Sequence, residues 1–198
     1  IAQARIVIQG YGEFQTPGFV QSSLSLTHPV FFNDQTMGSV EVVYTQTPPN
    51  NSRQAFLPEE EKTIESVAFH VGDIIRYVQM ITEQQKLSRA LEQTADTVVI
   101  TDRDGVIEYI NPSFESKTGY SREEAVGNKP NLLKSDEHPP EFYQTMWETI
   151  LNGDVYRDTV INRAKDGSLY YEYKTITPLY DQAGNLTHFL ATGKDLTE

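Results

Sequence analysis

The feature that most constrains this chain of 198 residues is a series of short β-rich segments and tight turns over residues 97–194. Residues 97–101 and 106–110 are β-rich and flank a turn with Asp104-Gly105 at its tip, which is typical of a β-hairpin. Three longer β-rich runs follow at residues 155–163, 168–179 and 186–194, with glycine-containing turns between them. The pattern predicts two strands, an intervening segment and three further strands.

The intervening segment carries the signals of three short helices. Pro112 opens the first helix, which is expected to run to residue 120. Ser121 and Glu124 have the spacing of a capping box, which predicts a second helix that ends at Gly127. Residues 139–140 start the third helix. Its apolar stripe consists of Phe142, Met146, Trp147 and Ile150.

Four short motifs accompany this order of elements: ITDRDGVIEYINPSF, TGYSREEAVG, NRAKDGSLYYE and the closing KDLTE. Together they resemble the PAS domain, and the resemblance covers residues 95–198. It implies an α+β fold, in which helices flank one face of a five-stranded antiparallel sheet. The concave space between helices and sheet is the usual ligand pocket of that family. A PAS domain is a detector rather than a catalyst, so the resemblance implies a sensory role.

The first 57 residues predict a small sheet. Residues 5–8, 23–27 and 30–32 are strand candidates, and Asn33-Asp34 is a turn signal before a further strand at residues 40–44. Gly38 suits a bulge or a close approach of two backbones, and residues 47–52 read as a loop. With the FLPEEEKTIESVA segment that follows, this region resembles a reduced GAF-like sensory module. Domains of that kind precede PAS modules in bacterial signalling proteins.

Residues 58–94 predict one long helix that connects the two regions. Pro58 suits the first helical position, and the three glutamates after it favour the positive end of the helix dipole. Two sets of apolar residues recur every seven positions: Ile64, Val71 and Val78, and Val67, Ile74 and Ile81. This spacing indicates a dimeric coiled coil and hence a homodimer. The alternative is that the first part of the helix packs on its own small sheet.

Composition excludes several classes of protein. A net charge of −12 argues against a nucleic-acid partner, because no basic patch is available to neutralise phosphates. The absence of cysteine excludes disulfides and thiolate metal sites, and it suits a cytoplasmic location. No apolar run approaches the ~20 residues of a membrane span, so no direct membrane contact is expected. No nucleophile constellation, phosphate loop or metal cluster indicates an enzyme in these residues.

The resemblance extends to the NifL-like redox-sensor type of PAS domain, which binds flavin as FAD. That type places a tryptophan on the third helix and an asparagine on the next strand near the flavin ring, and Trp147 and Asn162 match these positions. An indole can border a flat ring, and an amide can both donate to and accept from its polar edge. Val99 and Pro130 depart from that type, which has a serine and a glutamate there. In the alternative interpretation, Trp147 fills the core and Asn162 caps a sheet edge without a cofactor.

Two other cofactor chemistries are disfavoured. Light-sensing PAS domains that form a cysteine adduct need a cysteine in the segment that reads GNKPNLL here. Haem needs an axial ligand, usually histidine. His138 precedes the third helix, from which haem-type PAS domains use a histidine, but it lies in a polar loop typical of a surface residue. Haem is therefore not expected.

The closing motif carries the predicted output. In PAS domains, the side chains that match Asp195 and Thr197 tie the last strand to the start of an exit helix. The resemblance therefore implies a signal relay to a covalently attached C-terminal output domain, of a sensor histidine kinase or a diguanylate cyclase. A small ligand, a cofactor state or a redox signal would be the input. The alternative is a ligand-free PAS domain that acts as a dimerisation and interaction platform.

Overall fold

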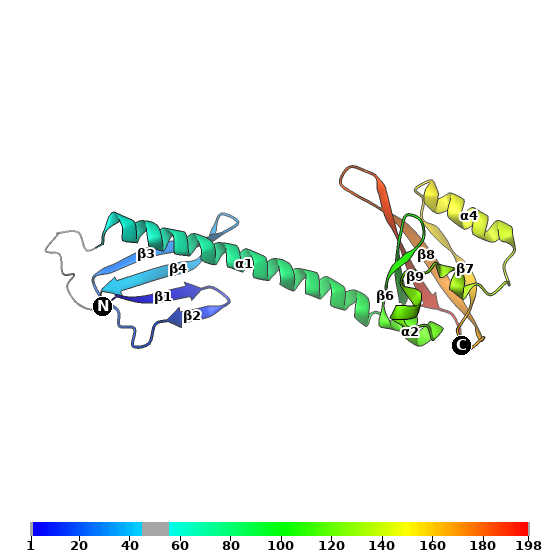
Figure 1. Cartoon of the computed structure of the whole chain (residues 1–198), viewed down its shortest axis with the longest axis horizontal. Helices are drawn as coiled ribbons and strands as arrows, with labels where there is room; N and C mark the ends of the chain where they lie inside the picture. The colour runs from blue at the N-terminus through cyan, green and yellow to red at the C-terminus, as the bar shows by residue number, and fades with distance from the viewer. Residues whose placement is uncertain (1, 45–55, 198) are drawn as a thin grey trace. The chain divides into compact units, whose positions relative to one another are not determined.

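The computed structural model describes residues 2–44 and 56–197. The loop expected at residues 47–52 lies outside the described residues. The chain divides into two compact units, Ile1–Gln85 and Lys86–Glu198, and each is described by itself (Figure 1). In the described part of the chain, no helix is long and apolar enough to cross a membrane.

The first unit contains a four-stranded antiparallel sheet in the order β2-β1-β4-β3. The strands are β1 (Ala2–Ile8), β2 (Gly12–Gln15), β3 (Ser25–Phe32) and β4 (Gln35–Tyr44). The predicted hairpin joins β3 to β4, and Asn33 and Asp34 form its turn with φ angles of +47° and +61°. β3 merges two of the expected runs through Pro29, which this edge strand accommodates. All four side chains of β2 are exposed, so no apolar alternation signals that strand.

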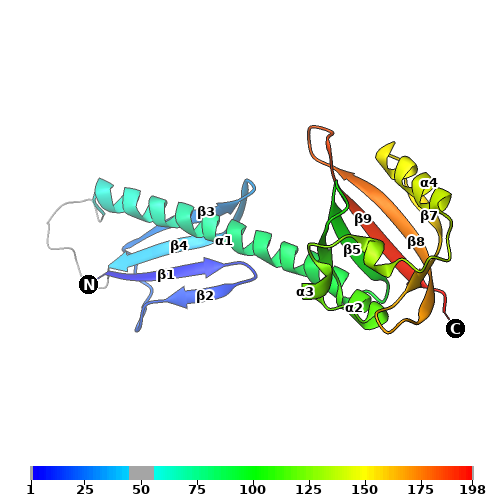
Figure 2. The same ribbon diagram turned by 45° about the vertical axis from the view of Figure 1, so that its right-hand side comes forward.

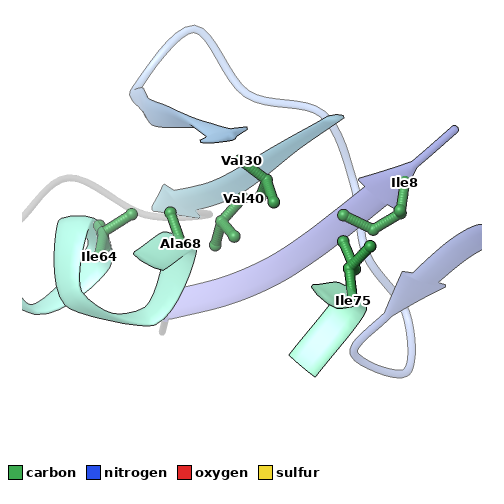
Figure 3. Close-up of a cluster of buried hydrophobic side chains, with 6 residues drawn as sticks. All are labelled: Ile8, Val30, Val40, Ile64, Ala68 and Ile75. Atoms are coloured by element: carbon green, nitrogen blue, oxygen red, sulfur yellow. The ribbon is translucent and has the colours of Figure 1, made fainter. Parts of the chain in front are cut away.

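Helix α1 (Pro58–Gln93) covers one face of this sheet with its N-terminal part (Figure 1). The helix and three strands share one buried apolar core. It consists of Ile8, Val30, Val40, Ile64, Ala68 and Ile75 (Figure 3). Gly72 lies in the same helical face, and a Cβ there would come within 2.6 Å of the Phe31 carbonyl oxygen. The helix backbone therefore approaches the sheet more closely than any other residue would allow.

This packing divides the heptad positions between two environments. Ile64 is buried in the core, and Val71 packs against it. Val67, Ile74 and Val78 are 41%, 61% and 39% exposed. The first part of the helix thus packs on its own sheet, as the alternative interpretation had it, and an apolar stripe at the other heptad positions is left uncovered within the unit.

The second unit contains a five-stranded antiparallel sheet in the order β6-β5-β9-β8-β7, with helices against one face (Figure 2). The strands are β5 (Thr97–Asp102), β6 (Ile107–Ile110), β7 (Tyr156–Arg163), β8 (Leu169–Tyr180) and β9 (Leu186–Asp195). The helices are α2 (Pro112–Thr118), α3 (Arg122–Ala125), the 3-10 turn η1 (Pro130–Leu133) and α4 (Pro140–Leu151). The predicted α+β arrangement is confirmed, and η1 is an addition to it.

Local side-chain bonds explain where these elements begin. The Asp102 carboxylate accepts from the backbone N–H groups of Asp104 and Val106, which shapes the first hairpin turn. Asn111 is fully buried; its side-chain oxygen accepts from Phe114 N and caps α2. The same amide accepts from Val98 N and donates to Leu91 O near the end of α1 and to Asp96 O just before β5. The predicted capping box of α3 is present.

Gly72→Ala is expected to destabilise the first unit by about 1–3 kcal/mol, because the added methyl group must push the helix away from β3. Hydrogen exchange should rise in residues 25–44 and 64–75 and stay unchanged in residues 97–195. Glu65→Ala, an exposed change on the same helix, serves as the control. Equal hydrogen-exchange rates of residues 25–44 and 64–75 in the two variants would contradict the close packing at Gly72.

Candidate functional site

A cavity of about 550 Å³ lies on the inner face of the second sheet, under α2, η1 and α4. The residues that line the cavity come from both hydrophobic clusters of the unit. The apolar part of the wall includes Val99, Phe114, Leu133, Trp147, Ile150, Ile176 and Phe189. A cavity of this size and polarity is typical of small-molecule sites.

The structure brings Trp147 and Asn162 to this one cavity, together with the two departing positions, Val99 and Pro130. Trp147 projects from α4 against the first hairpin turn, where a Cβ on Gly105 would come within 2.8 Å of the indole Cη2. The indole also meets Phe189 edge to face, with ring centroids 6.0 Å apart. Packing against the turn and Phe189 therefore holds the indole in the wall.

Asn162 lies on the inner face of β7 and is 6% exposed. Its Nδ2 donates to Glu172 Oε2 at 3.1 Å, so the amide is already bonded within the sheet. Its backbone forms a bridge with Lys134, which brings the segment after η1 to the edge strand β7. Asn162 therefore has a structural role, and it also lines the cavity.

Glu172 is a buried carboxylate that the sequence analysis did not single out. It is 2% exposed on β8 and accepts hydrogen bonds from Thr97 Oγ1 and Asn162 Nδ2. Lys174 Nζ lies 2.6 Å from its Oε2. The carboxylate occupies the space above Gly193, where any Cβ would overlap it. The alternation of β8 was an available signal, since residues 170, 172 and 174 share one face.

A second cavity of about 310 Å³ lies beside this carboxylate. Glu172 and Thr97 line it together with Gly193, Lys117 and Asp195. Two donors of Glu172, Asn162 and Lys174, line the larger cavity instead. The Glu172 carboxylate is therefore bonded to groups from the walls of both cavities.

Asp195 and Thr197 tie the end of β9 to other elements of the unit. The Asp195 carboxylate pairs with Lys117 Nζ of α2 and accepts from Thr197 N at 2.8 Å. Thr197 Oγ1 accepts from Tyr171 N of β8 at 3.1 Å. The hydrogen bond from Lys117, followed by those from Thr197, lowers the pKa of Asp195 below 3.8. The two predicted relay residues thus bind α2 and β8.

His138 does not line the large cavity, although it precedes α4. Its Nε2 accepts from Ile161 N at 2.8 Å, and its ring stacks on Phe142 with the ring centroids 3.8 Å apart. The neighbouring Ser135 Oγ donates to Ile161 O. These bonds attach the segment before α4 to the edge of β7, so His138 has a structural partner. In the described part of the chain, no cluster of three His, Cys, Asp or Glu side chains suits a metal ion.

Lys117→Met is expected to raise the pKa of Asp195 towards 3.8, because the largest cause of its depression is removed. A depressed folded-state pKa contributes stability above the unfolded-state pKa, and that stability is lost as pH falls through the folded-state value. The variant should therefore lose less stability on acidification. A carboxyl NMR titration measures the shift, with Lys194→Met, an exposed change on β9, as the control. An unchanged Asp195 titration would contradict this account of the junction.

Comparison with known proteins identifies the second unit. A family model described as the PAS fold matches residues 85–196, which is more than half of the chain. A nitrogen fixation regulatory protein of Klebsiella pneumoniae is 39% identical over 107 residues, covering 54% of this chain and 22% of that protein. A bacterioopsin transcriptional activator of Halobacterium salinarum is 30% identical over 120 residues, covering 59% of this chain and 18% of that protein.

A solved structure shares the fold. The PAS domain of a protein from Colwellia psychrerythraea superposes with a TM-score of 0.50 at 24% identity, covering 58% of this chain and 97% of that one. The matched region thus spans about a fifth of the curated relatives and nearly all of this isolated domain. Because the family match, the five-stranded antiparallel sheet and the cavity beneath its helices agree, the chain belongs to the PAS fold family.

Proposed function

We propose that this signal-sensing PAS module binds a flavin, as FAD, in the 550 Å³ cavity and relays its state through Asp195 and Thr197. The relay would reach a covalently attached C-terminal output domain, of a sensor histidine kinase or a diguanylate cyclase. The observation that carries the proposal is the convergence of Trp147 and Asn162 on one largely apolar cavity.

The residues of the cavity fit a flavin ring. The lining offers a flat indole at Trp147 and polar amide atoms at Asn162. Tyr143 also lines the cavity, and its buried hydroxyl has no hydrogen-bond partner among the described residues. Lys129 and Lys134 are exposed lining residues that suit the phosphates of a dinucleotide. A bound flavin would supply a redox change that these side chains sense.

The ligand-free platform is the second candidate function. Trp147 already packs against Phe189, and Asn162 already donates to Glu172, so both residues have a role without a cofactor. The first unit, in both cases, would serve as a GAF-like input module. Its antiparallel sheet with a helix across one face is the support for that part of the proposal.

A second copy of this chain is the partner proposed for α1. Val67, Ile74 and Val78 keep the seven- and four-residue spacing of a coiled-coil seam, and all three are exposed. A parallel homodimer would bury this stripe and couple the helices of two sensors.

FAD binding is tested with the purified chain after unfolding and refolding with excess FAD. Flavin absorbance that stays with the protein, and a titration followed by flavin fluorescence, measure binding. Trp147→Leu and Asn162→Ala should each weaken it roughly 3- to 10-fold, from the loss of a ring contact or hydrogen bond worth ~1 kcal/mol.

Tyr173→Leu removes an exposed aromatic residue of the same domain and should leave FAD affinity unchanged. Failure of the unaltered chain to retain FAD would reject the flavin proposal and favour the platform.

The homodimer is tested by light scattering after gel filtration. Ile74→Glu places a charge in the exposed stripe and should convert a dimer into a monomer. Glu65→Gln, on another exposed part of the helix, should keep the dimer. A monomeric unaltered chain, or a dimer that Ile74→Glu does not weaken, would contradict the coiled-coil proposal.

A further inference from the structure

Glu172 lies directly across the β8–β9 ladder from Asp195, since the two residues are paired in the register. Like charges directly opposite each other in a sheet are destabilising. Each carboxylate has its own cation: Lys174 Nζ lies 2.6 Å from Glu172, and Lys117 pairs with Asp195. The two lysines therefore offset the repulsion between the two negative charges at this position of the ladder.

The donors of Glu172 divide between the two cavities. Asn162 and Lys174 line the large cavity, where a ligand would bind, whereas Thr97 lines the small cavity beside Asp195. A buried carboxylate is costly unless its hydrogen bonds are satisfied. A ligand atom that accepts from Asn162 Nδ2 or attracts Lys174 Nζ therefore competes with Glu172 for its donors. An anionic acceptor competes most strongly for the lysine.

The β9 backbone at Gly193 lies directly against the Glu172 carboxylate. Gly193 of β9 pairs with Thr97 on one side and with Lys174 on the other, so two donors of Glu172 flank it. The carboxylate fills the space that a Gly193 side chain would need. Thr97 Oγ1 also donates to Gly193 O at 3.3 Å, two residues before Asp195. A shift of the carboxylate thus acts on the strand that carries the relay residue.

We propose that Glu172 is the positioning residue that couples the large cavity to the Asp195–Lys117 ion pair. A ligand that withdraws Lys174 leaves the carboxylates of Glu172 and Asp195 with less neutralising charge, and one that withdraws Asn162 leaves Glu172 without a hydrogen bond. In either case the change falls on the end of β9. The ligand class that does this is a planar molecule with a carbonyl or anionic acceptor at the Asn162–Lys174 end of the cavity. The ligand part rests on the proposed function; the coupling between the two ion pairs does not.

The coupling is tested without ligand by a carboxyl NMR titration of Asp195. Lys174→Met leaves Glu172 without its cation, so the pKa of Asp195 should rise. The shift should vanish in the double variant with Glu172→Gln, which a purely structural role of Glu172 would not produce. Lys174→Arg keeps the charge, and Lys194→Met removes a charge from the other face of β9; neither should change the titration.

Glu172→Gln alone covers the case in which Lys174→Met does not fold. It removes the opposed charge but keeps the shape of the side chain, so the pKa of Asp195 should fall. An Asp195 titration that is unchanged in whichever of these variants fold would overturn the coupling.

A second arm uses FAD, before and after reduction with dithionite, and follows hydrogen exchange of residues 193–197. Reduction should change the exchange rates in the unaltered chain and not in Glu172→Gln, although that variant should still bind FAD. No FAD binding by either protein would sink the flavin proposal alone, since the ligand-free titration decides the coupling. An equal change in both proteins would overturn Glu172 as the coupling residue.

Discussion

The pairing of β9 with β5 on one side and β8 on the other holds the PAS unit together. β9 is the middle strand of the sheet, and it lies between the β5–β6 pair and the β7–β8 pair. The pairing of Thr97 with Gly193 brings residues from the two ends of the domain together. The helices between these strands must then lie on one face, and the apolar clusters beneath them enclose the cavity. This pairing therefore fixes the sheet residues that line the cavity, and it fixes the position of Asp195 at the end of β9.

The same pairing concentrates charge where the strand leaves the sheet. Glu172 is buried and pairs with Lys174 of the same strand, β8. Asp195 is half exposed and pairs with Lys117 of α2. The chain has a net charge of −12, so these two carboxylates are neutralised by their own lysine partners and not by an excess of positive charge in the chain. Burial makes the loss of one lysine more costly at Glu172 than at an exposed carboxylate. In the proposed coupling, this asymmetry would let an event in the cavity affect the end of β9 that carries Asp195.

Helix α1 shows a different use of one sequence pattern. Its heptad repeat is compatible with a dimer seam and with packing on the sheet, because both need apolar residues three and four positions apart. The close approach at Gly72 selects which residues turn inward, and Ile64 and Val71 lie on that side. Val67, Ile74 and Val78 remain exposed, so the helix has an apolar face available to a second chain.

Local signals in the sequence determined most of the second unit. The turn at Asp102–Gly105, the cap of α3 and the strand runs each depend on residues close together in the chain, and all are confirmed. Trp147 and Asn162 could be named in advance because a family resemblance supplied their positions, and whether they hold a flavin stays a proposal. The strand β2 and the turn η1 were missed because neither carries a periodic apolar pattern. Only the tertiary structure placed Glu172 over Gly193 and opposite Asp195, because strand register depends on the pairing of distant segments.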